Sequence, residues 1–135
     1  MRSLLVLDND IQQIPKLTEF IEQIAEQANL DMALTMSLNL ALEEAVSNVM
    51  MYAYPAGTKG QVEIEANFND GTFQFVMSDS GVPFDPTAKQ DADISLSVED
   101  RPIGGLGIFL VKNIMDTVSY KWSDGKNILT MTKKV

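Results

Sequence analysis

Two polar side chains on one edge of a predicted helix are the first candidates for chemistry. Glu44 and Asn48 lie one helical turn apart, in a segment, 31–53, whose apolar residues recur at helical spacing. At about 100° per residue, Glu44 lies roughly 110° and Asn48 roughly 70° from the centre of the apolar face, whereas Glu43 is predicted to face solvent. Glu44 could accept a proton, and the Asn48 carboxamide could offer an oxygen to Mg²⁺. The alternative is a partly solvated Glu beside an Asn with local hydrogen bonds.

A second candidate, Asp79, stands directly after a predicted strand. It opens the segment 79–86, which reads DSGVPFDP. A carboxylate at the end of a strand, followed by a Gly that permits close backbone approach, is placed to accept a hydrogen bond from a donor such as an exocyclic amine. An ordinary Asp-Ser-Gly turn is the alternative interpretation.

A third candidate is the glycine-rich segment 104–107, which reads GGLG and precedes a helix predicted from Ile108 to about Asp116. Glycines let the backbone fold closely against phosphates, and the free N–H groups at a helix N-terminus favour negative charge. The segment is neither a Walker loop nor a dinucleotide fingerprint, because no Gly-Lys-Ser/Thr follows it and no strand directly precedes it. A flexible glycine hinge is the alternative.

The composition excludes several classes of catalytic and metal-binding residue. The chain has 135 residues with no Cys and no His, which excludes thiol nucleophiles, imidazole bases, phosphohistidine and metals ligated by either residue. Nineteen acidic and ten basic residues give a net charge of -9, which disfavours direct binding to nucleic acid or to an anionic membrane. No apolar run is long enough for a signal peptide or a membrane span, so a cytoplasmic location is expected.

The elements that must position these candidates follow from periodicity and turn residues. The patterns predict one domain, residues 1–135, with a strand at 4–7, helices at 11–28 and 31–53, a hairpin of 62–68 and 73–77, an irregular stretch at 80–103, the helix from 108, and a hairpin of 118–122 and 128–132. This order indicates an α/β fold of two layers, with helices on one face of a sheet. Eight methionines could line adaptable contact surfaces, although filling an irregular core is the commoner use; among them are Met32, Met36, Met50, Met51 and Met115.

Together and in this order, the three candidate segments resemble the N, G1 and G2 boxes of the GHKL ATPases, and within that superfamily the anti-sigma factor serine kinases. Residues 44–48, EAVSN, are similar to the family's EAxxN box, 79–86 to its DxGxPFDP variant, and 104–111, GGLGIFLV, to its GGLGLFLV box. The resemblance covers essentially the whole chain. It implies a Bergerat ATP-binding fold: an α+β two-layer sandwich with a mixed, mostly antiparallel sheet and a long ATP lid at about 80–107.

The resemblance also implies roles for individual residues, with ATP and Mg²⁺ as cofactors. Asn48 would supply its amide oxygen to Mg²⁺, Asp79 would accept a hydrogen bond from the adenine amino group, and Glu44 would polarise the attacking hydroxyl. The backbone of the glycine segment would wrap the phosphates as the lid closes. The implied nucleotide-binding residues are Asn48, Tyr52, Asp79, Gly81, Pro83, Gly104, Gly105, Leu106 and Gly107.

Two positions depart from the family's more usual pattern. Pro83 stands where the general GHKL pattern has Gly, but related anti-sigma regulators share this Pro, so the change bears more on kinase activity than on ATP binding. Tyr52 stands where many relatives have His, which removes a titratable donor near the phosphates.

The function implied by the resemblance is that of an ATP-dependent switch. The protein would bind and inhibit a sigma factor, and as a serine kinase it would transfer the γ-phosphate of ATP to a serine of an anti-anti-sigma (STAS-type) partner. The relatives are dimers, which makes a homodimer an expectation. Three alternatives remain open: a nucleotide-dependent partner-binding module without kinase activity, the catalytic fragment of a histidine kinase, and a domain that binds no nucleotide. The absence of His argues against the histidine kinase, because no side chain could accept its phosphate.

Overall fold

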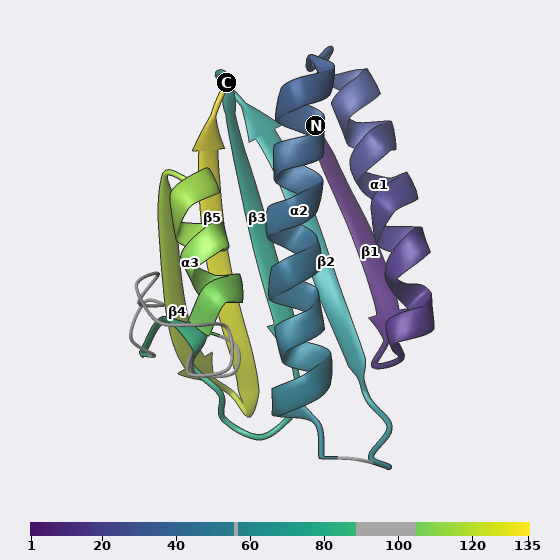
Figure 1. The fold of residues 1–135 in the computed structure, drawn as a ribbon, viewed down its shortest axis with the longest axis vertical. Coiled ribbons are helices and arrows are strands. Elements are labelled where there is room, and N and C mark those ends of the chain that lie inside the picture. Colours follow the sequence, from purple (N-terminus) through teal and green to yellow (C-terminus); the bar gives the residue numbers. More distant parts are fainter. Residues whose placement is uncertain (56, 89–104) are drawn as a thin grey trace.

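A computed structural model of the protein describes residues 1–55, 57–88 and 105–135. These residues form a two-layer α+β fold, in which the helices cover one face of a single sheet (Figure 1). No helix within these ranges is both long enough and apolar enough to cross a bilayer. In chain order the elements are β1 (Arg2–Asp8), η1 (Ile11–Gln13), α1 (Ile14–Gln27), α2 (Met32–Asn48), η2 (Val49–Ala53), β2 (Gln61–Asn69), β3 (Thr72–Asp79), η3 (Pro86–Ala88), α3 (Gly105–Ile114), β4 (Thr117–Ser123) and β5 (Lys126–Lys134).

The five strands form one sheet in the order β1-β2-β3-β5-β4. All four strand pairs of the described sheet are antiparallel, so it is more regular than the mixed, mostly antiparallel sheet that we expected. The middle strand is β3, and its last residue, Asp79, pairs with Val62 on β2 and with Asn127 on β5. The sheet therefore holds Asp79 between two neighbouring strands.

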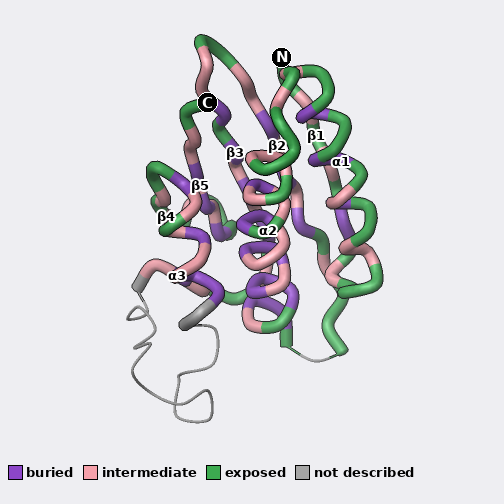
Figure 2. The backbone as a smooth tube through the Cα atoms, turned by 45° about the horizontal axis from the view of Figure 1, so that its top comes forward, coloured by how far each residue is buried: buried purple, intermediate pink, exposed green. Residues whose placement is uncertain are grey.

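Alternating residues on the central strands supply the sheet's side of the core. Ile64 on β2 and Phe75 on β3 are fully buried, whereas Gln74, the neighbour of Phe75, is exposed. Helices α1 and α2 contribute apolar side chains such as Ile21 and Leu42 from their inner faces. Buried positions recur along the central strands and along α2 (Figure 2). The predicted arrangement, with helices packed on one face of the sheet, is confirmed.

The helix expected at 31–53 is confirmed, but it contains two kinds of helical turn. Asp31 caps the N-terminus of α2, where its side chain accepts a hydrogen bond from the Leu34 N–H at 2.7 Å. The α-helix ends at Asn48, and the chain continues as the π-helical turn η2. Turns of this kind are frequent at functional sites.

The third helix begins earlier than the sequence pattern indicated. We expected it to run from Ile108 to about Asp116, but α3 spans Gly105–Ile114. Residues 105–107 therefore belong to the first turn of the helix rather than to the loop before it. Glycine has a low helix propensity, and two of these three residues are Gly, which is why the pattern placed the boundary too late.

Replacing a core ring tests the assignment of the buried face. Phe75→Ala is expected to lower the free energy of unfolding by about 3–5 kcal/mol, because it removes a fully buried aromatic side chain and leaves a cavity. Gln74→Ala on the same strand is the matched control and should change it by less than about 0.5 kcal/mol. Urea denaturation measures both values. Equal effects of the two substitutions would contradict the assignment.

Candidate functional site

Most of the predicted site residues that the structure describes lie at one end of the molecule. The C-terminal end of α2, the end of β3, the start of α3 and the start of β5 all lie at the lower end of the fold in Figure 1. Asn48 from α2 and Asp79 from β3 line a common hollow with Phe84, Tyr120 and Asn127. Segments that are far apart in the sequence thus contribute polar groups to one place.

Glu44 and Asn48 meet the first turn of α3. A Cβ atom placed on Gly107 would lie 2.9 Å from Glu44 Oε2 and 3.3 Å from Asn48 Nδ2. A side chain at position 107 would therefore require the ends of the Glu44 and Asn48 side chains to shift, whereas glycine allows this close approach as it stands. Asn48 is buried and Glu44 is half-buried. Glu43, which we expected to face solvent, is also only partly exposed.

Asp79 is a buried carboxylate, with only 4% of its surface exposed. Its Oδ1 atom accepts hydrogen bonds from Asn127 Nδ2 and from the backbone N–H of Gly81, both at 2.9 Å. Burial raises the pKa of the Asp79 carboxyl above its ordinary value, and these two hydrogen bonds act in the opposite direction. Because both bonds from described residues end on Oδ1, Oδ2 is the oxygen that an incoming donor would use.

Asn127 is the residue that sequence reasoning missed. Its Nδ2 also donates to the carbonyl of Val82 at 2.9 Å, and its Oδ1 accepts from the N–H of Phe84 at 2.8 Å and from the Tyr120 hydroxyl. One buried carboxamide thus uses all of its hydrogen-bonding capacity to fix Asp79 and the segment that follows it. The signal that was available is the alternation in β5, which places Asn127 on the same side as the buried Leu129 and Met131.

The π-helical turn η2 ties the end of α2 to the segment after Asp79. The ring of Tyr52 stacks on Phe84, with ring centroids 5.6 Å apart. The Val82 N–H donates to the carbonyl of Ala53 at 2.7 Å. A Cβ on Gly81 would collide with the same Ala53 carbonyl, so close packing requires glycine there. Two of the predicted nucleotide-binding residues, Tyr52 and Gly81, are therefore held in place by packing.

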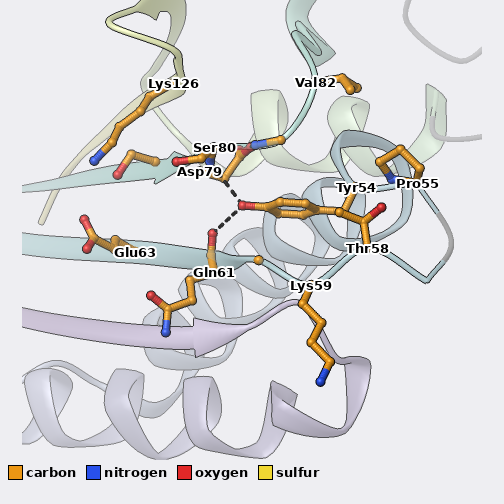
Figure 3. Close-up of a pocket in the computed structure, with 13 residues that line it drawn as sticks. Tyr54, Pro55, Thr58, Lys59, Gln61, Glu63, Asp79, Ser80, Val82 and Lys126 are labelled. Carbon is orange, nitrogen blue, oxygen red and sulfur yellow. Dashed lines mark hydrogen bonds between the residues drawn. The ribbon is translucent and has the colours of Figure 1, made fainter.

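Tyr54 links the start of β2 to Ser80, the residue that follows Asp79. Its hydroxyl donates to the carbonyl of Gln61 at 2.7 Å and accepts from the N–H of Ser80 at 3.1 Å (Figure 3). Burial raises the pKa of the Tyr54 hydroxyl. Tyr54 and Asp79 border an open hollow of about 630 Å³, whose lining also includes Glu63. Asp79 and Gly81 of the predicted site line this hollow, but Glu44, Asn48 and Gly107 do not.

The space inside the predicted site is small. The hollow that contains Asn48 and Asp79 encloses only about 10 Å³ between described residues, whereas ligand pockets are typically of the order of 300–1,000 Å³. A nucleotide would therefore have to displace side chains at the site. Its wall includes Phe84 and Pro86, which follow Asp79 in the chain.

Among the described side chains, no other predicted nucleotide-binding residue lines this small hollow. Pro83 is exposed, so it does not line the site in this arrangement. Gly105 and Leu106 lie in the first turn of α3, as given above. Gly104 and most of the expected lid lie outside the described residues. Within the described ranges no cluster of three or more Asp and Glu side chains could hold a metal ion by itself.

Removing the Asn127 carboxamide tests whether it holds Asp79 and the segment after it in place. Asn127→Ala is expected to lower the free energy of unfolding by about 2–4 kcal/mol, because it leaves several buried polar groups without a partner. It should also raise the pKa of Asp79, since one of the hydrogen bonds that lower this pKa is lost. Denaturation in urea and NMR titration of the Asp79 carboxyl carbon measure the two effects.

The matched control is Asn113→Ala, which removes an exposed carboxamide whose one hydrogen bond to a described residue is donated to the Phe109 carbonyl within its own helix. It should change the free energy of unfolding by less than about 1 kcal/mol and leave the pKa of Asp79 unchanged. An Asn127→Ala protein with wild-type stability and an unchanged pKa of Asp79 would contradict this role of Asn127.

Known proteins share both the sequence and the fold of this chain. Residues 7–133 match the family model described as histidine kinase-like ATPase domain. The serine-protein kinase RsbW of Listeria monocytogenes is 30% identical over 116 residues, which cover 83% of this chain and 73% of RsbW. The serine/threonine-protein kinase BtrW of Bordetella bronchiseptica is 27% identical over 113 residues, which cover 84% of this chain and 80% of BtrW.

A solved structure supports the same assignment at the level of the fold. The crystal structure of the RsbU and RsbW domains of Rv1364c from Mycobacterium tuberculosis superimposes with a TM-score of 0.71 at 14% identity. The match covers 99% of this chain but 32% of that longer one. The chain therefore belongs to the histidine kinase-like ATPase domain family, together with the RsbW and BtrW kinases, as its three boxes predicted.

Proposed function

We propose that this protein binds Mg-ATP and acts as a serine kinase and anti-sigma factor. It transfers the γ-phosphate to a serine of an anti-anti-sigma, STAS-type protein and sequesters a sigma factor in the cytoplasm. The observation that carries the proposal is the close approach of Glu44 and Asn48 to the first turn of α3, at the same end of the fold as the buried Asp79. The kinase names of the RsbW and BtrW relatives support the reaction type.

Asp79 is suited to select adenine. A buried carboxylate with one oxygen held by Asn127 and Gly81 leaves its second oxygen for the exocyclic amine of the base. A guanine base has a carbonyl oxygen at that position, and two acceptors facing each other in a buried site repel. Because acceptance requires the ionised carboxylate, and because burial raises the pKa of Asp79, nucleotide affinity should fall on acidification at a higher pH than for an exposed Asp.

Two residues of α2 that face the start of α3 fit Mg²⁺ held mainly by phosphate oxygens. Mg²⁺ commonly uses one or two protein oxygens, with the remaining positions filled by phosphates and water. Asn48 and Glu44 supply an amide oxygen and a carboxylate beside Gly107, where a side chain would crowd both groups. Asn48 would hold the ion, whose chemistry is to neutralise charge on the phosphates.

Glu44 is the residue proposed to act on the reacting hydroxyl. The serine oxygen of the partner forms a bond to the γ-phosphorus, the bond from that phosphorus to the β–γ bridging oxygen breaks, and ADP leaves. The hydroxyl proton passes to the Glu44 carboxylate. Free N–H groups in the first turn of α3 would face the phosphates and stabilise their charge. This chemistry needs positioning and charge neutralisation, and it proceeds without His.

Phosphate transfer to candidate STAS-type proteins tests the proposed reaction. Glu44→Gln keeps the size of the side chain but removes its basicity, so the transfer rate should fall about 10²- to 10⁴-fold while Mg-ATP binding persists. Glu43→Gln, on the neighbouring residue, is the matched control and should transfer at nearly the wild-type rate. Radiolabelled γ-phosphate measures transfer, and calorimetry measures binding.

Two results would contradict the kinase. Wild-type transfer by Glu44→Gln would remove Glu44 from the mechanism. A wild-type protein that forms a tight, nucleotide-dependent complex with its partner but transfers no phosphate would be the partner-binding module without kinase activity.

A further inference from the structure

A groove between α1 and α2 lies at the end of the fold opposite the proposed nucleotide site. Helix α1 ends and α2 begins at the upper end of Figure 1, while Asn48 lies at the other end of α2. Met36 and Asn48 are twelve residues apart, which corresponds to about 18 Å along a helix. A hollow of about 540 Å³ opens here, lined in part by Glu22, Glu26 and Met36. We call it the α1/α2 groove.

The wall of the groove on α2 consists of two exposed methionines and the half-buried Thr35. Met32 and Met36 line the hollow and are 78% and 66% exposed, and Leu40, one turn further along, is 42% exposed. Residues spaced by four occupy neighbouring turns on one side of a helix, so these three form a continuous apolar stripe. Methionine side chains are flexible and adapt to differently shaped partners. The stripe is thus an exposed surface of the kind that helices recognise.

The wall of the groove on α1 is acidic. Glu22 and Glu26 lie one turn apart and are both exposed. In the part of the chain that the structure describes, neither of them forms an ion pair. The two long helices and their connection, residues 14–48, contain six acidic residues and one Lys. The groove therefore combines exposed methionines with uncompensated negative charge.

We propose that the α1/α2 groove binds a basic amphipathic helix of a partner protein. The apolar ridge of that helix would pack on the methionines, and its Lys or Arg side chains would pair with Glu22 and Glu26. A second copy of this chain is a poor occupant, because its net charge of -9 would add like charge to an acidic surface. This interaction goes beyond the proposed kinase reaction, since it uses none of the residues at the nucleotide site.

A designed peptide tests the groove directly. The probe is a fluorescein-labelled helical peptide of about 18 residues with Leu every three or four positions and Lys on both flanks of that ridge. The reference peptide has Glu in place of each Lys. Fluorescence anisotropy should show that the wild-type protein binds the basic peptide, less tightly as salt increases, and binds the acidic one at least about tenfold more weakly.

Substitutions in the groove should weaken binding of the basic peptide while the fold, followed by circular dichroism, stays intact. Met32→Ser with Met36→Ser should raise the dissociation constant about tenfold or more, because the apolar anchors are lost. Glu22→Gln with Glu26→Gln should raise it about three- to tenfold at low salt and reduce its dependence on salt.

Matched controls remove the same groups elsewhere. Asp70→Asn with Asp124→Asn takes two charges from the hairpin turns, where Asn tolerates the positive φ, and Met51→Ser removes a methionine that is 55% exposed on η2. Each control should change the dissociation constant by less than about twofold. Asp79→Asn should bind ATP about ten- to a hundredfold more weakly and keep peptide binding, so that a failure of the nucleotide site and a failure of the groove are distinguishable.

Three results would overturn the proposal. The charge control could weaken binding as much as the glutamate pair, which would indicate general attraction to an acidic protein. The acidic peptide could bind as well as the basic one. Alternatively, Met32→Ser with Met36→Ser could convert a dimer to monomers in gel filtration, which would assign the groove to a second copy of the chain.

Discussion

The hydrogen bond between the side chains of Asn127 and Asp79 is the contact on which the proposed nucleotide site depends. It joins the second residue of β5 to the last residue of β3 inside the fold, where both groups are almost completely buried. A buried carboxylate is costly unless it is hydrogen-bonded, so Asn127 offsets the cost of placing Asp79 there. The same carboxamide also holds the backbone of Val82 and Phe84, which makes the shape of the segment after β3 depend on it.

Much of this arrangement could be predicted because it follows from local patterns. Both hairpins were predicted from the Asp-Gly turns at Asp70 and Asp124 and from the alternation of apolar residues. Helices α1 and α2 were predicted from the helical spacing of apolar residues. The three boxes also identified the family before any geometry was known. Local patterns suffice where the residues that form an element are neighbours in the sequence.

The contacts that could not be predicted join residues far apart in the chain. Asn127 and Asp79 are separated by 48 positions, and only the register between β3 and β5 brings them together. The approach of Gly107 to Glu44 depends likewise on how α3 packs against α2. The π-helical turn after Asn48 has no distinct hydrophobic period, so the pattern merged it with the preceding helix. Tertiary packing, rather than local preference, decided each of these features.

We propose that the end of the sheet around Asp79 binds the adenine of ATP. Isothermal titration with ATP and with GTP, both with Mg²⁺, tests it on the wild-type protein and on Asp79→Asn. The wild-type protein is expected to prefer ATP to GTP. Asp79→Asn should bind ATP about ten- to a hundredfold more weakly, because an amide side chain can keep the bond to Asn127 but offers the base a donor in place of an acceptor. A wild-type protein without affinity at millimolar ATP, or an Asp79→Asn protein with unchanged affinity, would contradict it.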